Sequence, residues 1–321
     1  MNRATTLVAF TQEECELAKR VLATQVAVMM GRKLEEGDWS KVYCRAKQMP
    51  ESGWSNLHID INCCGLGVEM KLLRCAQLNG KPLKSVCGTS LMHPAATRSI
   101  RIDDVNQPAE AVMRDVFRQY AELIQQRTNA ECPGTPPDMR VGWLLWEDSL
   151  TEFLYFEERM TPPNPDLFYA EWNITPARGV RKPSKSLWVY DKESHEKRYS
   201  VTTSAGIKIQ PYFDVPAPSD PHLYYFRVQS EPMDDGTVRM WVSASTASAL
   251  KQCLGSLDTN ILSEAIVRMS KTKPKDTVSE KQDYDLAVPI LVTKVAHALL
   301  ISLWEGVSDE HRAQLLLKSL V

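Results

Sequence analysis

The stretch NLHIDINCCGLGVEMKLLRC, residues 56–75, decides how the first half of the chain folds. Apolar and polar residues alternate on both sides of Cys64-Gly65, which is typical of two strands joined by a tight turn. Glycine supplies, at little cost, the positive φ that such a turn needs. With a two-residue turn, the numbers of residues that face each other sum to 129. The sequence therefore predicts a hairpin over residues 57–73.

In this register the side chains sort into an apolar face and a charged face, because successive side chains on a strand alternate. The predicted facing pairs are Ile61 with Val68 and Ile59 with Met70 on the apolar face, and Asp60 with Glu69 and His58 with Lys71 on the charged face. A slip by one residue would mix the two sets. Both strands therefore agree on which face is buried.

The charged face brings two carboxylates, Asp60 and Glu69, directly opposite each other, which destabilises a sheet unless positive charge lies between them. Mg²⁺ prefers one or two carboxylates together with waters and a phosphate oxygen. Lys71 points to the same side as Glu69 and could orient or deprotonate a water, or stabilise charge on a phosphate. The alternative interpretation is a solvated face with cross-strand ion pairs.

Asp60, followed nine positions later by Glu69-x-Lys71 on a hairpin, resembles the PD-(D/E)xK nucleases, to which many type II restriction endonucleases belong. The resemblance covers about 15 residues directly. It departs from the family pattern at Ile59, which stands where the motif has proline. The resemblance implies that Asp60, Glu69 and Lys71 are catalytic.

The same resemblance implies a bound Mg²⁺, with the carboxylates of Asp60 and Glu69 and the carbonyl of Met70 as its ligands. Such nucleases often add an acidic residue from a preceding helix. Glu13 and Glu16 are the candidates for this position. We therefore expect a Mg²⁺-dependent endodeoxyribonuclease that hydrolyses phosphodiester bonds in double-stranded DNA at specific sequences.

Two segments after the hairpin carry side chains suited to nucleic acid. Residues 88–102, GTSLMHPAATRSIRI, combine small polar residues with arginines, which contact phosphates and read guanine. Residues 177–186, ARGVRKPSKS, are basic and are followed by aromatic residues. The alternative for each segment is a solvated loop. The candidate DNA-binding residues are His93, Thr97, Arg98, Arg101, Arg178, Arg181, Lys182 and Lys185.

The remaining patterns predict an α+β fold. A mixed sheet flanked by helices would form a nuclease core over residues 1–165, and a β-rich DNA-recognition region with C-terminal helices would occupy residues 166–321. The breaker-rich TPPNPD at 161–166 marks the boundary. Helices are expected at 12–30, 107–127, 246–254, 259–270, 286–303 and from 308 onward, and strands at 140–147, 152–158, 167–173, 186–191, 197–203, 206–213, 222–229 and 237–243.

Two segments are expected to lack helices and strands. The helix from residue 12 is expected to stop at Gly31 or at Gly37, and a polar and aromatic connection through Trp39, Tyr43 and Trp54 follows it. Residues 271–285 are charged, low in apolar residues, and read as a loop.

Composition argues against a membrane protein and a secreted protein, but it does not identify a binding partner. The formal charge of −2 argues weakly against nucleic-acid binding, although binding depends on where positive charge lies. No run approaches the roughly 18 to 20 apolar residues of a membrane helix, and no secretory signal is present, so a cytoplasmic protein is expected. The eight cysteines form no CxxC pair, which makes a zinc site the weaker interpretation.

Two other functions stay open. One is a non-catalytic protein that binds DNA or reads modified bases, and the other is an interaction protein without nucleic acid. Cutting both strands symmetrically favours a homodimer.

Overall fold

The computed structural model describes residues 6–29, 34–51, 59–75, 78, 90–92, 96–97, 100–129, 138–147, 150–161, 163–177, 182–203, 207–270 and 287–304. These residues form helices and mixed sheets, as an α+β fold requires. The α-helices are α1 (Gln12–Met29), α2 (Glu36–Ala46), α4 (Ala109–Asn129), α5 (Ala244–Leu254), α6 (Thr259–Met269) and α7 (Lys294–Trp304).

Within the described residues, the strands form three sheets. The first has the order β1-β2-β5-β6-β11, the second β3-β10-β9-β8-β7 with β4 also on β10, and the third β12-β13-β14. The strands are β1 (Ile61–Cys63), β2 (Leu66–Cys75), β3 (Ser90–Met92), β4 (Ala96–Thr97), β5 (Asp138–Glu147), β6 (Glu152–Arg159), β7 (Phe168–Thr175), β8 (Ser184–Asp191), β9 (Lys197–Thr202), β10 (Lys208–Asp214), β11 (Tyr224–Arg227), β12 (Glu231–Pro232), β13 (Thr237–Val242) and β14 (Val288–Thr293).

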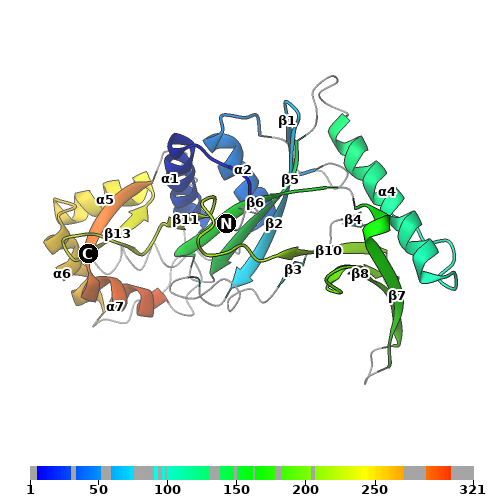
Figure 1. Cartoon of the computed structure of the whole chain (residues 1–321). Helices are drawn as coiled ribbons and strands as arrows, with labels where there is room; N and C mark the ends of the chain where they lie inside the picture. The colour runs from blue at the N-terminus through cyan, green and yellow to red at the C-terminus, as the bar shows by residue number, and fades with distance from the viewer. Residues whose placement is uncertain are drawn as a thin grey trace.

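The first sheet is mixed and lies at the centre of the molecule (Figure 1). β2 and β5 are parallel, whereas its other neighbouring strands are antiparallel. Two parallel strands need a long connection, and α4 lies between β2 and β5 in the sequence. A tight hairpin, a helix and a parallel strand therefore follow one another in this half of the chain.

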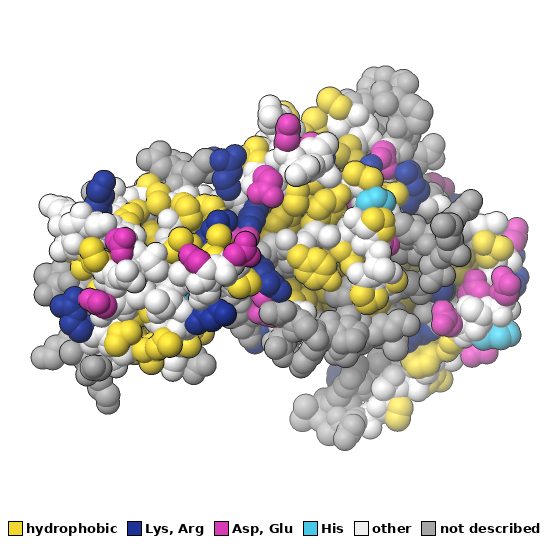
Figure 2. Space-filling model, turned by 60° about the vertical axis from the view of Figure 1, so that its left-hand side comes forward, with side chains coloured by type: hydrophobic (Ala, Val, Ile, Leu, Met, Phe, Trp, Pro, Cys, Tyr) yellow, Lys and Arg dark blue, Asp and Glu magenta, His cyan; other side chains and the backbone are white. Residues whose placement is uncertain are grey.

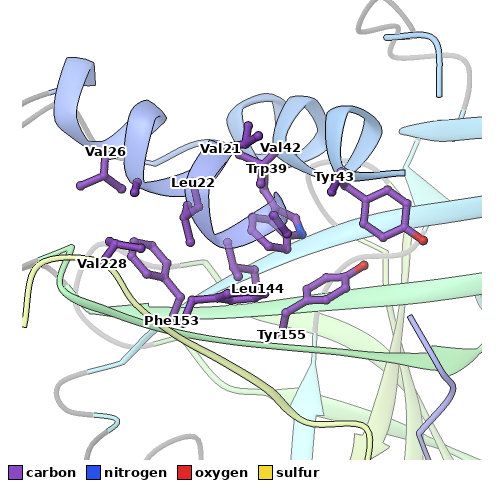
Figure 3. Close-up of a cluster of buried hydrophobic side chains, with 14 of the residues drawn as sticks. Val21, Leu22, Val26, Trp39, Val42, Tyr43, Leu144, Phe153, Tyr155 and Val228 are labelled. Carbon is purple, nitrogen blue, oxygen red and sulfur yellow. The ribbon is translucent and has the colours of Figure 1, made fainter. Parts of the chain in front are cut away.

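α1 and α2 cover one face of the first sheet. Thr11 caps α1, because its Oγ1 accepts the N–H of Glu14 at 3.2 Å and its own N–H donates to Glu14 Oε2 at 2.8 Å. The close-up in Figure 3 shows Val21 and Leu22 of α1 and Trp39 of α2 above Leu144 and Phe153 of the sheet. Burying these side chains fixes both helices on the sheet.

The prediction of a connection through Trp39 and Tyr43 is wrong, because both residues lie in α2. Trp39 and Tyr43 are both 0% exposed and pack on Tyr155, with ring centroids 4.9 Å and 6.0 Å away. Asp38 ties the start of α2 in place, since its carboxylate accepts the N–H of Glu35 at 2.9 Å and Gln25 Nε2 at 3.1 Å. Trp54 lies outside the described residues.

α4 and the second sheet cover the other face of the first sheet. Phe117 of α4 is 1% exposed and packs in one cluster with Trp143 of β5 and Leu187 of β8. Strands from both sides of residues 161–166 share sheets, because β11 pairs with β6 and β3 pairs with β10. Residues 161–166 therefore mark a change in the sequence pattern, but strands from before and after this segment pair in the same sheets.

The third sheet packs with α5, α6 and α7 around its own core. The single helix predicted over 286–303 is wrong at its start, where β14 pairs with β13 along Val288–Thr293 before α7 begins. Val288, Ile290 and Val292 meet apolar partners on β13, and β-branched residues favour such pairing. The predicted loop at 271–285 and the predicted helix from 308 lie outside the described residues. Within the part of the chain described here, no helix is long and apolar enough to cross a membrane.

Candidate active site

The turn at the tip of the hairpin has the predicted register. Ile61 pairs with Val68, and Cys63 pairs with Leu66. Cys64 and Gly65 have φ values of 51° and 84°, so both central residues lie in the left-handed region, as a tight hairpin turn requires. This local geometry places β2, with Glu69 and Lys71, beside β5 in the middle of the sheet.

The predicted pairing is wrong beyond Ile61, where the described ladder between the two strands ends. Ile59 packs in the core on the α4 side of the sheet, while Met70 packs on the side of α1 and α2. Asp60 turns its carboxylate to the backbone of β2, where Oδ2 accepts the N–H of Met70 at 2.7 Å. His58 lies outside the described residues.

Lys71 is the buried cation of the site. It is 6% exposed, and its Nζ donates to Glu69 Oε1 at 2.9 Å. Glu36 Oε1 lies 3.9 Å from the same nitrogen. Burial acts to lower the pKa of Lys71, but the charges of Glu69, Glu36 and Asp60 outweigh it and raise the pKa above its ordinary value. Lys71 is therefore held as an ammonium ion.

Glu36 is the acidic residue that α2 brings to this site, and the sequence reasoning missed it. Its side chain is 32% exposed, compared with 13% for Glu69. Burial raises the pKa of Glu36, while Lys71 acts to lower it. Glu13 and Glu16, the residues considered from the sequence, are exposed on α1. The missing signal was α2 itself, because Glu36 can be placed only once this helix is recognised.

The surroundings of Asp60 disfavour the charged form of its carboxyl group. Burial and the neighbouring charge of Glu69 raise its pKa to about 7, although Lys71 and the Met70 N–H act in the opposite direction. Crowded, partly buried carboxylates gain stability from any added positive charge. No group of three or more His, Cys, Asp or Glu side chains in the described ranges is arranged to hold a metal ion.

Four of the eight candidate DNA-binding residues lie in the part of the chain that the structure describes. Thr97 lies in β4, where it pairs with Lys208 of β10. Arg101 and Lys182 are exposed. The Nζ of Lys185 donates to the carbonyl of Val105 and lies 4.2 Å from the centroid of the Trp172 ring, so both contacts are within the protein. His93, Arg98, Arg178 and Arg181 lie outside the described residues.

Charged side chains of both signs are exposed on the described surface. On the face drawn in Figure 2, Lys and Arg side chains are interspersed with Asp and Glu. On the second sheet, Lys197 lies over two rings, 4.4 Å from the centroid of Trp188 and 4.7 Å from that of Tyr212. Basic and aromatic side chains thus meet on β8, β9 and β10.

Comparisons of the chain with protein-family models, with curated proteins and with solved structures found no match.

Proposed function

We propose that this protein is a Mg²⁺-dependent DNA endonuclease of the type II restriction enzyme kind, with its active site at Asp60 just before β1, on β2 and at the start of α2. The observation that carries the proposal is the convergence of Glu69, Lys71 and Glu36, with Asp60 coupled to them through charge. The order of hairpin, helix and parallel strand around these residues supports the same interpretation.

The donor set fits a hard divalent cation. Asp60 and Glu69 offer carboxylate oxygens and Met70 a carbonyl, and Mg²⁺ accepts one or two carboxylates with waters and a phosphate oxygen in its other positions. When bound, the ion would polarise the phosphate and make water a stronger nucleophile. Asp60 and Glu69 would hold it, and the bond from the Met70 N–H would orient the carboxylate of Asp60.

Lys71 would act beside the ion. Its ammonium group can stabilise the negative charge that develops on the phosphate, because it is buried and fixed by Glu69 before substrate arrives. Glu36, which is more exposed than Glu69, can accept a proton from a water or bind a second-layer water. The four residues thus divide into ion-holding groups and groups that act on the reacting phosphate.

We further propose double-stranded DNA as the substrate, a homodimer as the acting form, and the region after residue 165 as the source of sequence recognition. Exposed Arg101 and Lys182 support the DNA assignment, since such side chains contact phosphates. Cleavage of both strands at one site follows naturally from two-fold symmetry.

The second candidate is a protein that binds DNA, or reads modified bases, without cutting. One observation favours it: the ion pair of Lys71 with Glu69 already supplies positive charge to the carboxylates. A site neutralised in this way can be stable without a metal ion.

The test is incubation of unmethylated phage DNA with the protein and about 5 to 10 mM Mg²⁺, with EDTA as a control. Glu69→Gln and Lys71→Met are compared with Glu13→Gln, an exposed glutamate on α1. Discrete fragments from the wild type and from Glu13→Gln alone would support the proposal. Equal cutting by all variants would refute the site, and binding without cutting would favour the second candidate.

A further inference from the structure

The hairpin turn carries two adjacent thiols whose chemistry the proposed function does not use. Cys63 ends β1, and Cys64 is the first turn residue. Their Sγ atoms lie 3.7 Å apart, with Cys64 exposed and Cys63 partly buried. Cys44 and Cys75, in contrast, are buried in the two cores of the first sheet. An oxidant in solution therefore reaches the turn more easily than these cysteines.

We propose that Cys63 and Cys64 form a reversible disulfide that acts as a redox-sensitive modification site on the hairpin, with hydrogen peroxide as the class of oxidant. The exposed thiol of Cys64 gives up its proton as its sulfur attacks one peroxide oxygen; the O–O bond breaks, a sulfenic acid forms, and the departing hydroxide takes the thiol proton and leaves as water. The sulfur of Cys63 then attacks the sulfenic sulfur. The S–S bond forms, and the hydroxyl leaves with the thiol proton as a second water.

The bond between these neighbours is strained and therefore easy to reduce. Consecutive Cα atoms across a trans peptide are about 3.8 Å apart, whereas disulfides usually join Cα atoms roughly 4.4 to 6.8 Å apart. Strained and exposed disulfides have higher reduction potentials and belong to the labile, regulatory group. A thiol reductant thus returns the turn to its dithiol form.

Closing this ring alters the turn that sets the hairpin register. Cys64 has a φ of 51°, in the left-handed region, and the ring strain is relieved by changing the backbone of this residue and its neighbour. β1 pairs with β2 through three described residues, from Cys63 at the turn to Ile61, so a change at the turn is carried along a short ladder. The bond from the Met70 N–H to Asp60 lies just beyond the last of these pairs. Oxidation is therefore expected to loosen Asp60.

This consequence for Asp60 matters for catalysis only if the proposed function is correct, so the test uses readouts that do not depend on cleavage. The whole protein is treated with hydrogen peroxide, and the peptide containing the turn is analysed by mass spectrometry. Amide hydrogen exchange of Met70 is followed in the same samples. We expect loss of two hydrogens within this peptide, reversal by dithiothreitol, and a fall in Met70 protection of about tenfold or more.

Two variants provide the controls. Cys64→Asn keeps a residue that tolerates positive φ and should show neither the disulfide nor the change at Met70. Cys253→Ser changes an exposed cysteine on α5 and should behave like the wild type.

Three outcomes would overturn the inference: over-oxidation of Cys64 without an S–S bond, a disulfide to another cysteine, or unchanged Met70 protection after the bond forms. Failure of the reduced wild type to cut DNA would instead overturn the proposed function, and the mass and exchange results would stand separately.

Discussion

The amine of Lys71 and the carboxylate of Glu69 lie 2.9 Å apart, on side chains two positions apart along β2. Alternation puts both on one face of the strand, and burial strengthens their attraction. Because Lys71 neutralises the carboxylates without a metal, it competes for charge with any cation that binds there. Lys71 is therefore expected to weaken Mg²⁺ binding while it assists cleavage.

Lys71→Met is therefore expected to change the two properties in opposite directions. Removing the ammonium should tighten Mg²⁺ binding, because two carboxylates lose a competing cation. Cleavage should fall by roughly 10²- to 10³-fold, because the phosphate loses a fixed positive charge. Isothermal titration with Mg²⁺ and a cleavage assay measure the two effects. Weaker Mg²⁺ binding together with unchanged cleavage would contradict both roles.

Glu36→Gln tests whether the acidic residue of the site comes from α2. The substitution removes a charge 3.9 Å from Lys71 and keeps the shape of the side chain. Cleavage should fall by roughly 10-fold or more, as loss of a general acid–base or charge-holding group does. Glu13→Gln and Glu16→Gln, on the exposed face of α1, should retain activity. If either α1 variant lost activity while Glu36→Gln kept it, the assignment to α2 would be wrong.

Elements whose structure is set by neighbouring residues in the sequence could be predicted, whereas elements set by distant contacts could not. The turn at Cys64-Gly65 and its register followed from alternation and from backbone preferences within ten residues. The segment Val288–Thr293 did not, because a short apolar run fits a buried strand or a helix equally well, and pairing with β13 decides between them.

Three charged residues of the candidate site, Asp60, Glu69 and Lys71, were selected from the sequence, whereas their arrangement and Glu36 were not. Glu69 and Lys71 share a face, as alternation requires. Asp60 accepts the Met70 N–H because it lies just before the first residue of β1, Ile61. The alternation of apolar and polar residues does not indicate that the strand begins there. Glu36 reaches Lys71 through the packing of Trp39 and Tyr43, which is a tertiary contact.

Gly142 is expected to tolerate no side chain, because Tyr155 and Met70 occupy the space that a Cβ would need. It pairs with Met70 across the parallel strands, and a Cβ there would lie 2.4 Å from Tyr155 Oη and 2.9 Å from Met70 Sδ. Gly142→Ala should cost about 1 to 3 kcal/mol of unfolding free energy through overpacking. Gly37→Ala is the matched control, since a Cβ on Gly37 meets nothing within 4 Å and alanine favours a helix. Urea unfolding of both variants measures the difference, and equal stabilities would contradict this packing argument.

Asp138 should make the folded state sensitive to acid. Hydrogen bonds from Arg140, at 3.1 Å and 2.6 Å, hold the pKa of Asp138 below its ordinary value. Because the folded-state pKa is the lower one, this ion pair stabilises the protein above the unfolded-state pKa of about 4. The stabilisation is lost as the pH falls from there through the folded-state pKa.

The Asp138→Asn variant tests this contribution together with that of Arg159, whose Nη1 lies 3.3 Å from Asp138 Oδ1. Asparagine cannot ionise, so the variant should be less stable than the wild type at pH 6, and the gap should narrow as the pH falls below about 4. Glu122→Gln serves as a comparison, since Glu122 forms an exposed ion pair with Arg118 on α4, and such pairs contribute little. Urea unfolding at pH 6 and pH 3 measures both variants. A gap between wild type and Asp138→Asn that stays constant across this range would show that the ion pairs of Asp138 with Arg140 and Arg159 do not cause the acid sensitivity.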